Sequence, residues 1–212
     1  MKCAKEKIIS IIVKCAHAYK KELLNKNIIF VCMDKHKRVY FTQVLFEAGN
    51  FLHLTGCETN KTISAKEFFN KCLEKKISSR DFEISQDGTT EMKLIVLPFL
   101  ISKNLSANMM GDFSGNNLNL YSEKIIGGVK ACMGFVKKQN NFYAPNTVLN
   151  VDARKYIKKP MRIIATFRKN KSDKKYCEMV YKAKNINWDV LVFPKEIEYL
   201  KEFCKESGRI NE

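Results

Sequence analysis

Residues 27–33 (NIIFVCM) form an apolar run of strand length, and the fold is predicted outward from them. Such a run between polar turn signals is typical of a buried strand. Upstream, residues 4–24 place apolar side chains every three or four positions, which predicts an amphipathic helix. Downstream, residues 34–37 predict a hairpin turn, and residues 38–44 predict the returning strand.

Two more helices and a series of strands follow this hairpin. Ser64 and Glu67 have the spacing of a capping box at the start of one helix, and residues 90–102 predict another despite Pro98. Short β-branched or aromatic segments come next, and a closing helix spans 196–206. The segments are residues 105–113, 117–122, 129–137, 147–151, 161–168, 176–183 and 188–193. This order predicts an α+β fold, a single domain over residues 1–212 with N-terminal helices packed on a central antiparallel β-sheet.

The chain is strongly basic. It has 38 lysines and arginines against 22 acidic residues, a net charge of +16, and residues 154–184 alone contain twelve basic and two acidic side chains. Like charges at this density repel one another and do not favour folding. The excess of positive charge therefore indicates a polyanionic partner such as RNA. The alternative is a general bias of the sequence toward lysine, asparagine and isoleucine.

Cysteine usage and hydropathy favour a cytoplasmic protein. The eight cysteines are scattered without a CxxC pair, so we expect reduced, buried side chains and no metal or cofactor. No apolar run approaches the length of a transmembrane helix, and the N-terminus lacks a signal-peptide pattern, so no membrane partner is expected.

Residues 51–56 (FLHLTG) are the strongest candidate for chemistry. His53 can accept and return a proton near neutral pH, Thr55 can bond a phosphate or orient the imidazole ring, and Gly56 allows the backbone to turn. The alternative is a structural histidine packed between apolar neighbours.

A phosphate-binding surface is predicted on two later segments. By the two-residue period of a strand, Arg162, Thr166 and Arg168 share one face, with Lys169 next in the chain. Upstream come Tyr143 and Thr147, then Arg154 and Lys155. The alternative is an edge strand with a solvated face.

These residue types suit cleavage of RNA without a metal ion. A base removes the proton of the ribose 2′-hydroxyl, an acid protonates the leaving 5′-oxygen, and cations stabilise the charge of the phosphorane. Asp112, Asp152, Asp173 and Asp189 are isolated in the sequence, and no paired acidic motif suggests a two-metal site.

The chain resembles the fourth phage-associated family of barnase–EndoU–colicin–RelE-like (BECR) nuclease domains. The resemblance lies in residues 15–21 (CAHAYKK), 51–56 (FLHLTG), 145–150 (PNTVLN) with Asp152 and Arg154, and 160–169 (PMRIIATFRK). It implies a helix-plus-antiparallel-sheet fold and an RNase activity in phages, prophages and related mobile elements. By the same resemblance, the catalytic residues would be His53, Thr55, Arg154 and Arg168.

Two functions follow from the sequence. The favoured one is a metal-independent endoribonuclease, a toxin or phage effector with an antitoxin or host defence protein as a further partner. The alternative is a non-catalytic module that binds nucleic acid or a host defence protein. Substrate binding in the first case is assigned to Tyr143, Thr147, Lys155, Arg162, Thr166 and Lys169.

Overall fold

The computed structural model describes residues 2–102, 105–114, 122–138 and 141–206. The helices are α1 (Lys2–Glu22), α2 (Asn50–Thr55), α3 (Ala65–Leu73), α4 (Thr89–Leu100) and α5 (Leu200–Glu206), with short 3₁₀ turns η2 (Ala153–Lys155) and η3 (Lys195–Ile197). The strands are β1 (Lys26–Met33), β2 (Val39–Leu45), β3 (Cys57–Thr59), β4 (Phe82–Ile84), β5 (Met109–Phe113), β6 (Lys124–Gly127), β7 (Cys132–Lys137), β8 (Phe142–Leu149), β9 (Ile157–Asn170) and β10 (Glu178–Lys182).

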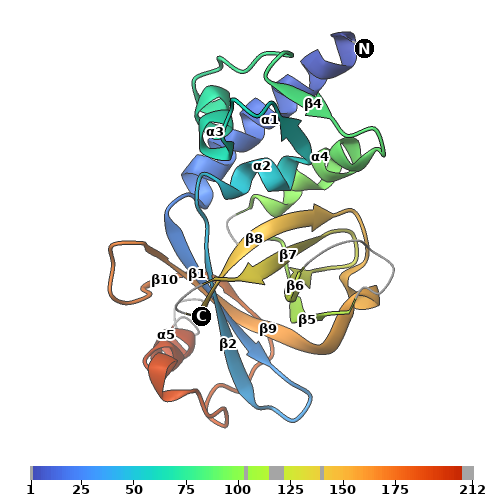
Figure 1. Cartoon of the computed structure of the whole chain (residues 1–212). Helices are drawn as coiled ribbons and strands as arrows, with labels where there is room; N and C mark the ends of the chain where they lie inside the picture. The colour runs from blue at the N-terminus through green and yellow to red at the C-terminus, as the bar shows by residue number, and fades with distance from the viewer. Residues whose placement is uncertain (1, 103–104, 115–121, 139–140, 207–212) are drawn as a thin grey trace.

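Among the described residues, seven strands form a closed, mixed β-barrel (Figure 1). Their order is β1-β2-β8-β7-β6-β5-β9, and β9 pairs back onto β1. The β2–β8 pair is parallel, whereas the other pairs of the barrel are antiparallel. The expectation of N-terminal helices on a central antiparallel sheet is therefore wrong, because β9 is long enough to pair with β5 along its first half and with β1 along its second.

The predicted elements agree with the structure best in the N-terminal half. The first helix, the first hairpin, the Ser64-capped helix and the helix through Pro98 all form. In the C-terminal half β6 was not predicted, β8 begins five residues before the predicted strand, and residues 188–193 form no strand. Most of the predicted strand 117–122 lies outside the described residues.

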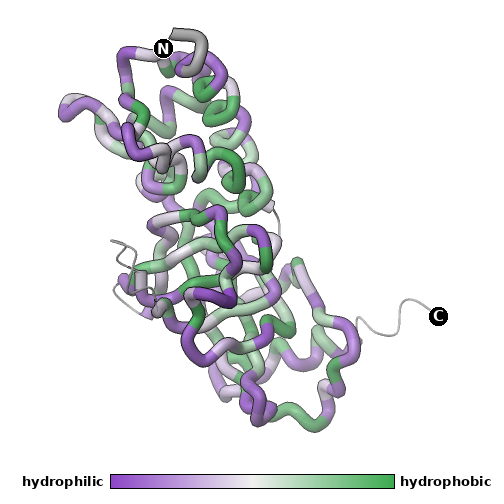
Figure 2. Tube along the Cα trace, turned by 90° about the vertical axis from the view of Figure 1, so that its right-hand side faces the viewer, coloured by the Kyte–Doolittle hydropathy of each residue, from purple (hydrophilic) through white to green (hydrophobic). Residues whose placement is uncertain are grey.

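Helices α1–α4 and the small two-stranded β3–β4 sheet form a layer at one end of the barrel (Figures 1 and 2). Tyr19 of α1 is fully buried there, and its ring contacts Phe46, Phe51 and Phe69 edge-on, with centroids 5.4–6.0 Å apart. Phe46 in turn contacts Phe135 of β7. The helices and the barrel interior thus share one continuous hydrophobic core.

A second core lies on the outer face of β1 and β9. Ile29, Val31 and Phe167 pack there against the C-terminal segment, which contributes Trp188 and Leu200. Residues 186–206 therefore cover a barrel wall that would otherwise be exposed and apolar.

Arg168 of β9 joins three elements at the helical end of the barrel. Its side chain is only 8% exposed, and it forms a bidentate pair with Glu178 of β10 at 2.6 and 2.8 Å. Its Nη1 also donates to the main-chain oxygen of Glu22, at the end of α1, at 3.0 Å. A cation at a helix C-terminus satisfies free carbonyl groups and complements the helix dipole.

We expect Arg168→Ala to lower the free energy of unfolding by about 2 kcal/mol or more, because it removes several charge-assisted hydrogen bonds from a buried cation. The matched control is Arg154→Ala. Arg154 makes a similar bidentate pair with Asp152, at 2.6 and 3.0 Å, but at the surface. Exposed pairs contribute about 0–1 kcal/mol. Urea unfolding measures both changes, and equal losses would contradict the anchoring role of Arg168.

Candidate functional site

The FLHLTG motif forms α2 after its first residue, together with the C-cap of this helix. Thr55 is the last helical residue, and Gly56 follows in the left-handed conformation at φ 69°. The Thr55 hydroxyl is fully buried, donates to the Leu52 carbonyl oxygen at 2.7 Å and accepts from the Cys57 N–H at 3.1 Å. Its hydrogen bonds thus hold the turn, and His53 projects from the same helix into solvent.

Helix α4 packs directly against this turn. The Thr90 hydroxyl donates to the Gly56 carbonyl oxygen at 2.6 Å, and the Lys93 Nζ donates to the His53 carbonyl oxygen at 2.9 Å. A Cβ at position 56 would lie 2.9 Å from Lys93 Cδ and 3.2 Å from Thr90 Cα. Glycine is therefore required here both for its positive φ and for the close approach of α4.

The electrostatic surroundings of His53 come from three elements. Partial desolvation lowers the pKa of the His53 imidazole below its ordinary value of 6.5, and the charges of Lys93 and Lys138 lower it further. Lys138 follows β7 in the β7–β8 connection, where its N–H donates to the Phe142 carbonyl oxygen at 2.7 Å. We call His53, Lys93 and Lys138 the His53 cluster.

The His53 cluster has the properties of a proton-transfer site for an anionic substrate. A lowered pKa keeps the imidazole neutral at neutral pH, which is the form that accepts a proton. The positive charges of Lys93 and Lys138, which lower the pKa of His53, favour an anionic group such as a phosphate at this place. Burial also lowers the pKa of Lys93 itself.

The β8 residues predicted to bind substrate differ in access. Tyr143 lies one residue after Phe142, is partly buried and packs at the edge of the main core. Thr147 is only 1% exposed. Tyr143 therefore has a partly accessible side chain near the turn that contains Lys138, whereas the side chain of Thr147 is not accessible to a substrate.

A β-bulge divides the predicted cationic face of β9. The register with β1 shifts so that Ala165 pairs with Val31 and Ile163 pairs with Cys32. As a result, Arg162 lies on the outer wall, whereas Thr166 and Arg168 lie on the inner side of the strand, opposite Phe30 and Ile28. Thr166 is 1% exposed, and Arg168 is held by the two glutamates described above.

The remaining predicted cations lie at separate places. Arg154 and Lys155 are exposed on η2, just before β9 begins. Lys169 lies near its other end, where its amine donates to the Lys174 carbonyl oxygen at 3.1 Å and stands 5.0 Å from the Tyr176 ring centroid. A strand rises about 3.3 Å per residue, so Arg154 and Arg168 are tens of ångströms apart along β9. The structure does not bring the four predicted catalytic residues into one cluster.

Lys93 and Lys138 were not predicted from the sequence. Each is one of 38 lysines and arginines, and neither belongs to a recognisable motif. Their relation to His53 arises only from the packing of α4 and the β7–β8 connection around α2.

The described part of the chain contains no group of three or more His, Cys, Asp or Glu side chains arranged to hold a metal ion. Of its seven cysteines assigned as free thiols, six are buried and Cys177 is exposed. Burial raises the pKa of the Cys15, Cys32 and Cys72 thiols to about 12, so these thiols stay protonated at neutral pH. Among the described helices, none has the length and hydrophobicity needed to cross a bilayer.

A basic chain with a lysine-flanked histidine on a mixed α/β scaffold has the features of a nucleic-acid-processing protein. A sequence model of the family described as phage-Barnase-EndoU-ColicinE5/D-RelE like nuclease4 matches residues 11–185. The chain therefore belongs to this phage-associated nuclease family, as its sequence motifs predicted. No curated protein and no solved structure matches it.

We expect Gly56→Ala to destabilise the protein more than Gly88→Ala does, by about 1 kcal/mol. Both glycines have positive φ, 69° and 77°, so each substitution carries the backbone strain of a left-handed alanine. A Cβ at position 88 meets nothing within 4 Å, whereas one at position 56 meets α4. Urea unfolding measures the difference, and equal losses would show that α4 does not constrain the motif.

Proposed function

We propose that this nuclease cleaves RNA without a metal ion and that His53 transfers the proton. The observation that carries the proposal is the exposed imidazole of His53 beside Lys93, whose amine donates to the His53 carbonyl oxygen at 2.9 Å, with Lys138 adding a second positive charge that lowers the pKa of His53. Such a cluster combines a neutral base with a site for phosphate charge.

In the proposed reaction, neutral His53 accepts the proton of a ribose 2′-hydroxyl. The 2′-oxygen attacks the adjacent phosphorus, and the bond to the 5′-oxygen breaks, so that the leaving oxygen takes a proton from solvent. The products are a 2′,3′-cyclic phosphate and a 5′-hydroxyl. Lys93 and Lys138 stabilise the negative charge that builds on the phosphorane oxygens.

Residues outside the cluster support binding in this proposal. Tyr143 stands beside the Lys138 turn and offers a partly exposed ring and hydroxyl to a nucleotide. Arg154, Lys155 and Arg162 are exposed and attract the RNA backbone. Arg168 acts through the fold, because its guanidinium is occupied by Glu178 and Glu22.

The first test is incubation of the purified protein with total RNA in the presence of EDTA. We expect cleavage with cyclic phosphate ends, and His53→Ala should reduce its rate by about 10²–10⁴, the usual contribution of general acid–base catalysis. The matched control is His36→Ala, which removes an exposed histidine from the β1–β2 turn and should leave the rate unchanged.

Three outcomes would contradict the proposal. Full activity in folded His53→Ala would remove His53 from the reaction, and loss of cleavage on chelation would establish a metal-dependent reaction. Tight, salt-sensitive binding with intact RNA would favour a non-catalytic binding module.

The pH dependence of cleavage provides a second test. A base must be deprotonated, so the rate rises with pH through the pKa of His53, and this acidic limb should lie below pH 6.5. Lys138→Gln removes a nearby positive charge, raises the pKa of His53 and should move the limb to higher pH.

The control variant is Lys137→Gln. It removes the same charge one residue away, from a side chain that does not contribute to lowering the pKa of His53. Identical shifts in the two variants, measured as initial rates from pH 4.5 to 8, would mean that only net charge matters.

A further inference from the structure

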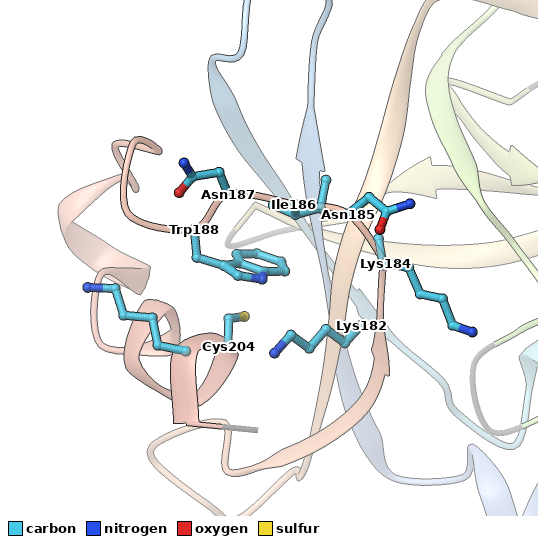
Figure 3. A pocket seen from close by; sticks show the side chains of 9 residues that line it. Lys182, Lys184, Asn185, Ile186, Asn187, Trp188 and Cys204 are labelled. Atoms are coloured by element: carbon cyan, nitrogen blue, oxygen red, sulfur yellow. The ribbon is translucent and has the colours of Figure 1, made fainter. Parts of the chain in front are cut away.

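An open hollow of about 770 Å³ lies beside α5, where β10 ends (Figure 3). Residues 182–188 form one wall, and Cys204 and Lys205 of α5 form the other. The indole of Trp188 stands between the two walls, and the amine of Lys182 reaches toward it from below. The ammonium lies 5.7 Å from the centroid of the indole ring.

The lysines of this hollow are not neutralised equally. Lys205 contacts Asp189 at 3.1 Å and Glu202 at 3.5 Å. Among the described residues, no carboxylate stands at ion-pair distance from the amines of Lys182 and Lys184. The hollow therefore presents the uncompensated positive charge of Lys182, and Lys184 carries a second one on the wall's other side, pointing away from Trp188 (Figure 3); both attract an anion.

Polar groups of the rim extend the same surface toward β9. Arg162 donates from Nη2 to the Lys184 carbonyl oxygen at 3.0 Å and lines a neighbouring hollow of about 450 Å³ together with Asn108 and Tyr181. A hydrogen bond thus links a lining residue of one hollow to a lining residue of the other. Exposed amides of Asn185 and Asn187 stand on the rim of the first hollow.

We infer that these two hollows form a secondary binding site for the sugar-phosphate backbone of single-stranded RNA, distinct from the His53 cluster. The choice of RNA, and not another polyanion, as the ligand rests on the proposed function. Lys182, Lys184 and Arg162 supply the phosphate contacts, while the amides of Asn185 and Asn187 and the partly exposed Tyr181 supply hydrogen-bonding and stacking groups of the kind that unpaired nucleotides use. Figure 1 shows α5 and α2 at different ends of the molecule, so a strand must be long to reach both sites.

Trp188 makes this site directly observable. It is the only tryptophan of the chain, and its ring lies against the Lys182 ammonium. A phosphate that draws this ammonium away from the indole changes the surroundings of the ring. We therefore expect a long 2′-O-methyl RNA oligonucleotide, which lacks the attacking hydroxyl, to change the intrinsic fluorescence, whereas a dinucleotide should not change it at low concentration.

The experiment compares the double variant Lys182→Gln/Lys184→Gln with the control Lys35→Gln/Lys37→Gln. The control removes two exposed charges from the β1–β2 turn. Each phosphate contact on a single strand contributes about 0.7 to the slope of log affinity against log salt, so the test variant should lower this slope by about 1.4. The control should change it far less, and cleavage of a dinucleotide should be unchanged in both variants.

Equal slope changes in the two variants, or an unchanged indole signal on binding of the long oligonucleotide, would overturn the inference. Preferential capture of an acidic peptide over RNA by the same lysines would also overturn it. If the oligonucleotide binds as expected but natural RNA is never cleaved, the proposed function fails and the secondary site stands. If RNA is cleaved but the slope does not respond, only the secondary site fails.

Discussion

Closure of the barrel depends on the pairing of β9 with β1. The register runs from Lys26 opposite Asn170 to Met33 opposite Arg162, across two strands that are separated by more than a hundred residues. Without this pairing the strands would form an open sheet with two edges, and a closed barrel has none. Both large cores border on the same pair, because inner residues of β1 contact the helical layer and outer residues contact the C-terminal segment.

The closed barrel also determines where functional groups can stand. Among the described residues, its interior is filled by apolar side chains and is continuous with the helical core, which leaves the ends and the outer wall for charged groups. The β9 bulge sends Arg162 to the outer wall and turns Arg168 inward, where it binds the end of α1. The guanidinium of Arg162 stays accessible to a ligand, whereas that of Arg168 stabilises the fold.

The motif around His53 has a structural part and a part to which we assign the proposed chemistry. Thr55 and Gly56 use their hydroxyl and backbone to end α2 and to receive α4. His53 is thereby fixed beside Lys93, while the β7–β8 connection supplies Lys138. The positions of the two lysines follow from the docking of elements that are distant in sequence, so the site is assembled by tertiary structure around a local motif.

Local signals in the sequence predicted part of this arrangement. The first helix, the first hairpin and the Ser64 cap depend on periodicity and on hydrogen bonds between near neighbours, and such patterns are visible in a single sequence. Barrel closure and the parallel β2–β8 pair depend on contacts between distant strands, which no local pattern encodes. The bulge in β9 inserts one unpaired residue, so the side chains before it point to the opposite face from the one that strict alternation predicts. The two-residue period of a strand cannot reveal such an insertion. His53 stands out because it is one of three histidines, whereas Lys93 and Lys138 are hidden among many lysines.

The most direct measurement of the central claim is an NMR titration of the histidine ring signals with and without a short 2′-O-methyl RNA. His53→Ala assigns the His53 signal, and the signals of His17 and His36 serve as internal references. If His53 lies in the substrate phosphate site, bound RNA offsets the charges of Lys93 and Lys138 and raises the pKa of His53. An unchanged His53 titration in the presence of saturating RNA would contradict the account.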